Sequence, residues 1–150
     1  QVTIPDSVTS IGVKAFFYCT SLTHVVLPLS LKSIGSKSFS FCTSLTEITI
    51  PSKVSRIDFE AFGNCRSLSQ VNFASPSTLS RIESRTFCEC TALNEITIPQ
   101  SVKLIKDYAF EDCNSLETVN VSPETFIQES SFEGCPVREY IEYKTTIFAY

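Results

Sequence analysis

Seven cysteines and one histidine are the side chains of this 150-residue chain with the greatest capacity for chemistry. Repeated cysteines can bind a metal, form disulfides or lie buried as free thiols. Six of the seven follow a phenylalanine by three residues and recur at intervals of 22 to 25 residues, which indicates a structural repeat. They are Cys19, Cys42, Cys65, Cys90, Cys113 and Cys135.

Stacked repeats would place these six thiols in one row of parallel side chains. A metal site needs cysteines that converge on the ion, and parallel Cα–Cβ bonds at strand spacing are slightly wide of disulfide geometry. We therefore predict buried free thiols, each bonded weakly to a backbone carbonyl of the neighbouring coil, with no metal and no cofactor. Cys88 precedes Cys90 by two residues, so we expect it to face solvent as the candidate for a reactive or intermolecular thiol.

The single histidine gives little support to an enzymatic function. A nucleophilic triad would have to be assembled around His24, which is expected at an outward strand position, and no buried acid occupies a matching repeat position. The sequence also contains no dinucleotide-binding, phosphate-loop or HExxH zinc-protease motif. We therefore expect no catalytic residues.

Apolar residues occupy further columns of the same repeat. An isoleucine lies five residues before each repeat phenylalanine, a leucine follows each of the first five repeat cysteines by three residues, and an alternating apolar pair comes next. Columns held in register over six units are too regular for chance. The repeat phenylalanines are Phe16, Phe39, Phe62, Phe87, Phe110 and Phe132.

One unit, residues 45–65, indicates how the chain folds locally. Residues 46–50 alternate polar and β-branched apolar side chains, which predicts a short half-buried strand. Pro51 ends this strand because it lacks the N–H that a ladder needs, and Val54 and Ile57 are expected to point inward. Stacking such units buries a shared interior and pairs equivalent strands in parallel. The units start near residues 4, 27, 50, 73, 98 and 121.

These motifs closely resemble the BspA-like leucine-rich repeat family, also called the Treponema pallidum type. The resemblance rests on residues 22–28, 33–35 and 61–65 and on the equivalent segments of the other units. It extends from roughly Ile4 to Cys135. It implies a strand-dominated solenoid of the α/β repeat class, with about six coils of 22 to 25 residues and a parallel sheet. It further implies a cell-surface or secreted adhesin of a mucosal bacterium or protozoan parasite that binds host matrix or cells.

The fourth unit and the two ends depart from the pattern. The fourth unit carries two extra residues between Phe73 and Leu79, which predicts a longer turn that bulges outward. Residues 138–150 are expected to form a last strand and cap, or the start of a further segment. From the length we expect one leucine-rich repeat domain over residues 1–150. Because the chain begins at Gln1 rather than at Met, we expect this domain to be a fragment of a longer array.

Composition and charge exclude several classes of function. With 43% hydrophobic and 19% charged residues the chain is too apolar to be disordered. The net charge of −4 at pH 7 argues against a nucleic-acid-binding protein that relies on overall positive charge. No apolar run approaches the ~18 residues of a membrane span, so we expect no membrane insertion by this segment. The columns that contain Lys14, Lys37, Arg56 and Arg81 predict a mildly basic side, which we interpret as solvated surface.

The outward face of the predicted strands is the expected contact surface for a protein partner. Solenoids bind extended or protein partners on such broad faces, and this one carries polar and β-branched residues without lysine. An intracellular scaffold in a larger assembly is the alternative, since free thiols are at home in a reducing cytosol. The predicted partner-binding residues are His24, Val26, Glu47, Thr49, Gln70, Asn72, Glu95, Thr97, Thr118 and Asn120.

Overall fold

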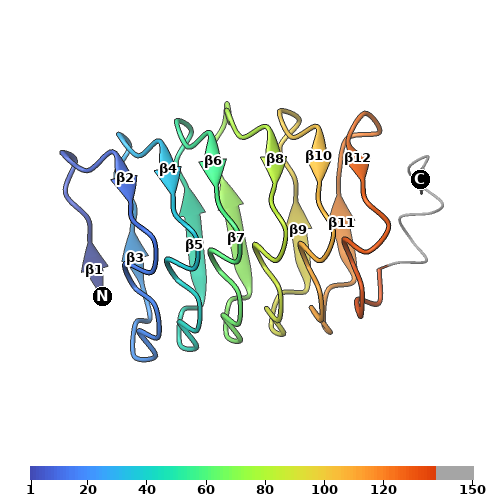
Figure 1. Ribbon diagram of the computed structural model, residues 1–150, viewed down its shortest axis with the longest axis horizontal. Helices are drawn as coiled ribbons and strands as arrows, with labels where there is room; N and C mark the ends of the chain where they lie inside the picture. The colour runs from blue at the N-terminus through green and yellow to red at the C-terminus, as the bar shows by residue number, and fades with distance from the viewer. Residues whose placement is uncertain (138–150) are drawn as a thin grey trace.

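In the computed structural model, which describes residues 1–137, the chain winds into a solenoid whose coils stack along one axis (Figure 1). Each coil contributes two short strands, one to each of two faces, and the described residues contain no helix. With six strands on each face, the described residues form five complete coils and part of a sixth. The strand-dominated solenoid predicted from the repeat is therefore confirmed.

The odd-numbered strands form one face, which we call the strand face, and the even-numbered strands form the second face; their arrows point in opposite directions in Figure 1. The strand face consists of β1 (Val2–Thr3), β3 (Val25–Val26), β5 (Glu47–Ile50), β7 (Gln70–Phe73), β9 (Glu95–Thr97) and β11 (Thr118–Asn120). The second face consists of β2 (Ser10–Ile11), β4 (Ser33–Ile34), β6 (Arg56–Ile57), β8 (Arg81–Ile82), β10 (Leu104–Ile105) and β12 (Phe126–Ile127).

Equivalent strands of neighbouring coils pair in parallel and in register. On the strand face, β1 pairs with β3, β5 with β7 and β9 with β11, so that Ile48 lies beside Val71 and Ile96 beside Val119. On the second face the ladders run β2–β4–β6 and β8–β10–β12. The parallel pairing expected from the repeat is confirmed.

A row of phenylalanine rings fills the interior. Neighbouring rings from Phe16 to Phe132 stack with centroids 5.0 to 5.5 Å apart and with planes within 15° of parallel. The four rings between these two, from Phe39 to Phe110, are fully buried. Each ring in a middle coil therefore packs against one ring on either side, as the repeat predicts.

The repeat cysteines form a second interior row that links each coil to the one before it. The Sγ of Cys65 donates to the carbonyl of Phe39 at 3.1 Å, and the Sγ of Cys90 donates to the carbonyl of Phe62 at 3.3 Å. Cys42, Cys113 and Cys135 make the same bond to the preceding coil at 2.9 to 3.2 Å. The predicted buried thiols and their carbonyl partners are confirmed for these five cysteines, whereas Cys19 in the first coil is partly exposed.

The prediction that Cys88 faces solvent is wrong. Its side chain is only 4% exposed, and burial raises the pKa of the thiol to about 12. The prediction applied the two-residue alternation of a strand, but Cys88 lies in a turn next to Glu89, whose φ is +53°. This turn directs the sulfur toward Gly63 of the preceding coil, where a Cβ atom would stand 3.1 Å from the Cys88 Sγ.

The turns beside the phenylalanine row use left-handed backbone at two positions in each of the first five coils. The residues two before and two after each repeat phenylalanine have φ between +53° and +63°. At these corners the backbone bonds to the next coil, as from the Asn64 N–H to the Cys88 carbonyl at 2.8 Å. Because a left-handed residue recurs at this spacing, no helix can run through the segment.

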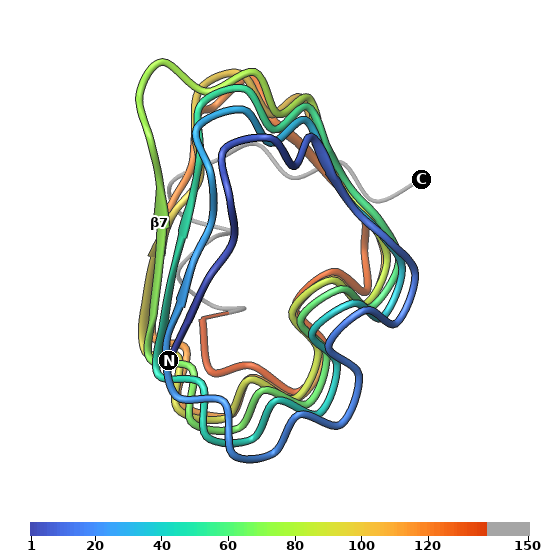
Figure 2. The same ribbon diagram turned by 90° about the vertical axis from the view of Figure 1, so that its left-hand side faces the viewer.

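The fourth coil departs from the others where its two extra residues lie. In the view along the stack, the turn after β7 protrudes beyond the corresponding turns of the other coils (Figure 2). The predicted bulge is therefore confirmed. The last strand or cap expected at 138–150 lies outside the described residues.

Candidate functional site

All ten side chains predicted to form the contact surface are exposed along the strand face. The alternation of β5 shows why, because Glu47 and Thr49 point outward while Ile48 and Ile50 are each 1% exposed in the core. The same alternation places Gln70 and Asn72 outward on β7, and Glu95 and Thr97 outward on β9. The pairing of the strands brings these side chains together as neighbouring rows on one broad surface.

A groove of about 920 Å³ opens in this surface between β7 and β9. Its walls are residues 69–77 and 94–101. On this face no ladder joins β3 to β5 or β7 to β9, and on the second face the ladder is interrupted between β6 and β8. The fourth coil therefore has no ladder to the fifth coil on the strand face and no ladder to the third coil on the second face.

The lengthened turn after β7 forms part of the wall of the groove. The lengthened turn is tied back to the preceding coil, because the Ala74 N–H donates to the Ile50 carbonyl at 2.9 Å and the Thr78 Oγ1 donates to the Ser52 carbonyl at 2.9 Å. In the interior, Phe87 and Phe110 still stack at 5.4 Å. The fourth and fifth coils therefore stay joined through their core. The sequence predicts the bulge, but it gives no sign of the groove.

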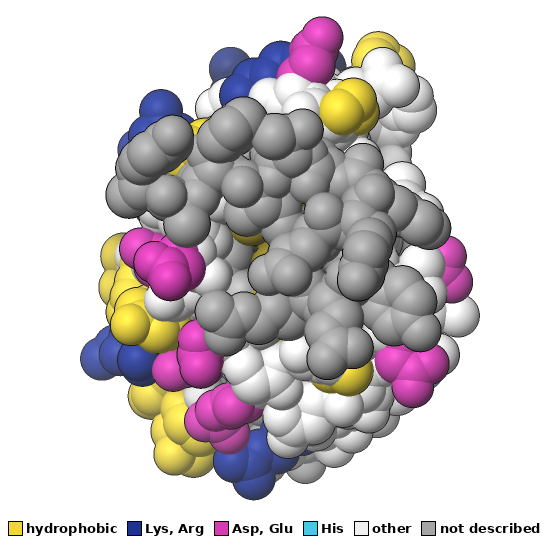
Figure 3. Space-filling view, turned by 90° about the vertical axis from the view of Figure 1, so that its right-hand side faces the viewer, with side chains coloured by type: hydrophobic (Ala, Val, Ile, Leu, Met, Phe, Trp, Pro, Cys, Tyr) yellow, Lys and Arg dark blue, Asp and Glu magenta, His cyan; other side chains and the backbone are white. Residues whose placement is uncertain are grey.

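The strand face carries acidic charge that no basic group offsets. The segments that form it contain Glu47, Glu95 and Glu117 but no lysine or arginine. None of these three carboxylates takes part in any of the seven ion pairs among the described residues. In the view from the C-terminal end of the stack, the side of the strand face shows acidic and uncharged polar atoms, and the visible lysines and arginines lie on the other sides (Figure 3).

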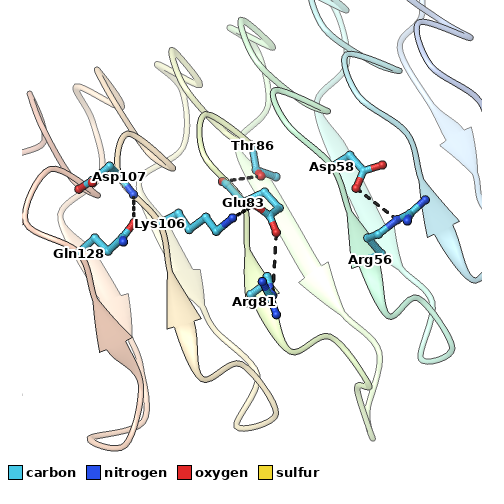
Figure 4. A network of polar contacts seen from close by, with 8 residues as sticks. All are labelled: Arg56, Asp58, Arg81, Glu83, Thr86, Lys106, Asp107 and Gln128. Carbon is cyan, nitrogen blue, oxygen red and sulfur yellow. Dashed lines mark hydrogen bonds and ion pairs between the residues drawn. The ribbon is translucent and has the colours of Figure 1, made fainter.

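The second face, by contrast, pairs its charges. Arg56 Nε lies 3.2 Å from Asp58, Arg81 Nε lies 3.9 Å from Glu83, and Lys106 also contacts Glu83 (Figure 4). The arginines that predict a basic side are thus matched by carboxylates, and this agrees with the interpretation of that side as ordinary solvated surface.

The side chains with the greatest capacity for chemistry are not gathered into one cluster in the described part of the chain. Within residues 1–137, no group of three or more His, Cys, Asp or Glu side chains is placed to hold a metal ion. The imidazole of His24 is exposed, and it makes no hydrogen bond or ion pair with another side chain of this part of the chain. The same residues include no helix that is long and apolar enough to cross a membrane.

Comparison with known families agrees with the repeat and the coil geometry. The chain matches the BspA type Leucine rich repeat region, in 6 copies, over residues 1–76 and 72–148. The chain belongs to the BspA-type leucine-rich repeat family. This is a family of repeat proteins with a fold of the protein-interaction type, and no catalytic family is indicated. None of the curated proteins matches the chain.

Solved structures of similar proteins share the fold. A leucine-rich repeat protein from Bacteroides ovatus is 36% identical over 90% of this chain, with a TM-score of 0.84. The T. pallidum leucine rich repeat protein is 33% identical over 90% of this chain, with a TM-score of 0.83. A leucine rich cell surface protein from Faecalibacterium prausnitzii is 22% identical over 99% of this chain, with a TM-score of 0.61. The chain spans 35%, 65% and 63% of these proteins, respectively.

Proposed function

We propose that this chain is a protein-binding module and that the strand face is its contact surface. The observation that carries the proposal is the uncompensated acidic charge of this broad, exposed face. A surface on which charges already pair gains little from a charged partner, whereas unpaired carboxylates attract a partner of opposite charge and fix its orientation. The ten outward residues predicted from the sequence form this surface, and their binding role is part of the proposal.

We further propose that the module works at the cell surface or as a secreted protein, in adhesion to host matrix or cells. This location is supported by membership of the BspA-type family. The structure from Faecalibacterium prausnitzii is that of a cell surface protein, but at 22% identity it supports only the fold.

An intracellular scaffold is the second candidate, and the seven free cysteines favour it because free thiols are typical of a reducing compartment. Buried thiols oxidise slowly, so they are also compatible with the surface. A secretion signal or membrane anchor in the full-length gene would favour adhesion over the scaffold.

A pull-down with charge-reversed variants tests the contact surface. The double variant Glu47→Lys and Glu95→Lys should lose a partner that the unchanged chain captures. The matched control is Asp6→Lys with Glu129→Lys, which changes the net charge equally at two exposed carboxylates outside the strand face. The proposal expects capture by the control and loss in the strand-face variant. Equal capture by both variants would place the contact surface elsewhere.

A further inference from the structure

We propose that a second copy of this chain docks in antiparallel orientation on the ridge formed by the turns beside the phenylalanine row. These turns lie on the side of the coils away from β7 (Figure 2). The inference goes beyond the proposed function, because it concerns a different side of the molecule. We call this surface the turn ridge, and its six equivalent segments are residues 12–21, 35–44, 58–67, 83–92, 106–115 and 128–137.

The turn ridge exposes large hydrophobic side chains. Four of the seven that are exposed among residues 1–137 lie on it, with exposed fractions from 40% to 68%. They are Val13, Tyr18, Phe59 and Tyr108. On the side away from the strand face, hydrophobic side chains lie beside lysines and arginines (Figure 3). Exposed hydrophobic side chains that gather in one patch mark an interaction surface.

In the first two coils the aromatic side chains of the ridge form one contiguous cluster. The rings of Tyr18 and Phe41 stack with centroids 4.5 Å apart, and Phe17 packs edge-on against both, at 4.8 and 6.0 Å. Lys14 Nζ lies 5.2 Å from the centroid of the Phe17 ring. This cluster lies outside the interior row, so its burial against a partner would remove apolar surface from water.

Charge on the turn ridge changes sign along the stack. Lys14 and Lys37 give each of the first two segments a formal charge of +1. Acidic residues outnumber basic ones by one in each of the two middle segments and by two in each of the last two. The interior rings are 5.0 to 5.5 Å apart over five intervals, so the ridge is about 26 Å long. Since the Debye length is about 8 to 10 Å, the two ends act as separate poles of opposite sign.

The charges at both ends are available to a partner. Lys14 is exposed and takes part in none of the seven ion pairs among residues 1–137, and the same holds for Asp112 and Glu129 at the other end. Lys37 adds to the positive end, although it also contacts Glu60 at 3.7 Å. Unpaired charges of opposite sign steer and orient association.

A second copy of the ridge matches both features when it runs antiparallel. A two-fold axis sets the positive, aromatic end of each copy against the negative end of the other, so every attractive contact forms twice. It also sets the fifth segment, with exposed Tyr108, opposite the second segment, with Phe41. A parallel pair would bring like poles together. A partner of uniform charge, such as an anionic lipid surface, would be repelled by one of the ends.

Sedimentation velocity of the unchanged chain tests the proposal. At about 100 μM protein and about 50 mM salt the species should have twice the monomer mass of 16.7 kDa. The dimer should dissociate at least about tenfold more readily in about 0.5 M salt, because salt screens the two poles. A monomer at about 100 μM in low salt would overturn the proposal. Species that grow beyond the dimer with concentration would also overturn it, because a two-fold contact closes on itself.

Charge reversal at either end should break the dimer. The variant Lys14→Glu with Lys37→Glu and the variant Asp112→Lys with Glu129→Lys should each raise the dissociation constant at least about tenfold, since each substitution acts at both ends of the interface. An equimolar mixture of the two variants should recover a dimer, which also shows that both are folded. A mixture that stays monomeric, while circular dichroism shows both variants folded, would refute the contact between opposite poles.

Two matched controls separate the ridge from the rest of the surface. Lys32→Glu with Lys53→Glu reverses two exposed lysines outside the ridge and should leave the dimer unchanged. Tyr18→Ser should weaken the dimer at least about tenfold, whereas Leu29→Ser, at a side chain that is 77% exposed outside the ridge, should not. If either control weakened the dimer as much as its ridge counterpart, the docking surface would not be the turn ridge.

Discussion

Truncation of one ring in the phenylalanine row should destabilise the whole solenoid. Phe62 is fully buried between Phe39, at 5.2 Å, and Phe87, at 5.5 Å. Phe62→Ala leaves a cavity in a rigid interior, and such substitutions cost about 3 to 5 kcal/mol. Two ring contacts are lost as well, each worth about 0.5 to 1.5 kcal/mol beyond the buried area. We therefore expect a value at the upper end of the cavity range.

Phe59→Ala is the matched control, because it removes the same side chain from the same coil. The Phe59 ring is 41% exposed, and Lys37 Nζ lies 5.9 Å from its centroid. Its loss should cost about 1 kcal/mol, from partial burial and a weak cation–π contact. Urea denaturation followed by circular dichroism gives both free energies of unfolding. If Phe62→Ala destabilised the protein no more than Phe59→Ala, the stacked row would not be what holds the coils together.

Two further predictions concern the thiols. Burial raises the pKa of Cys42 and Cys88 from 9.0 to about 12, so the unfolded chain loses these protons at lower pH than the folded chain. The contribution of these two thiols to the free energy of unfolding should be constant below about pH 9 and should fall as the pH rises toward 12, by about 1 kcal/mol per thiol at pH 10. A urea midpoint that does not move between about pH 8 and 10 would contradict this. In the native protein a maleimide should label Cys19, which is partly exposed, at least about tenfold faster than buried Cys88, as followed by peptide mapping. Equal labelling of the two would restore the solvent-facing assignment of Cys88.

Most of the fold could be predicted from the repeat, because the position of a residue within the repeat predicts whether its side chain is buried. In residues 46–50 the two-residue alternation separates Ile48 from Glu47, and five equivalent segments repeat the pattern. Register follows from this, since a slip by one residue would expose the apolar set on every coil. The exposed residues of the strand face were therefore within reach of sequence reasoning.

The errors and omissions arise where alternation does not apply. Cys88 lies in a turn between Arg85 and Glu89, both with left-handed backbone, so its direction depends on turn geometry rather than on spacing. The shape of the lengthened turn depends on which neighbour the inserted residues bond to, and Ala74 and Thr78 bond to the preceding coil. Which charges stay unpaired depends on contacts between coils. Arg66 and Glu89, for example, pair across two coils at 2.9 Å.

Hydrogen exchange of the chain with and without a bound polypeptide partner tests most directly whether the strand face is the contact surface. The partner is one captured by the unchanged chain in the pull-down. Binding should slow exchange of the backbone amides in the strands of the strand face, among them β5, β7 and β9. Exchange in the turns around the phenylalanine row, residues 58–65, should not change. Protection confined to those turns, with β7 and β9 unaffected, would contradict the account.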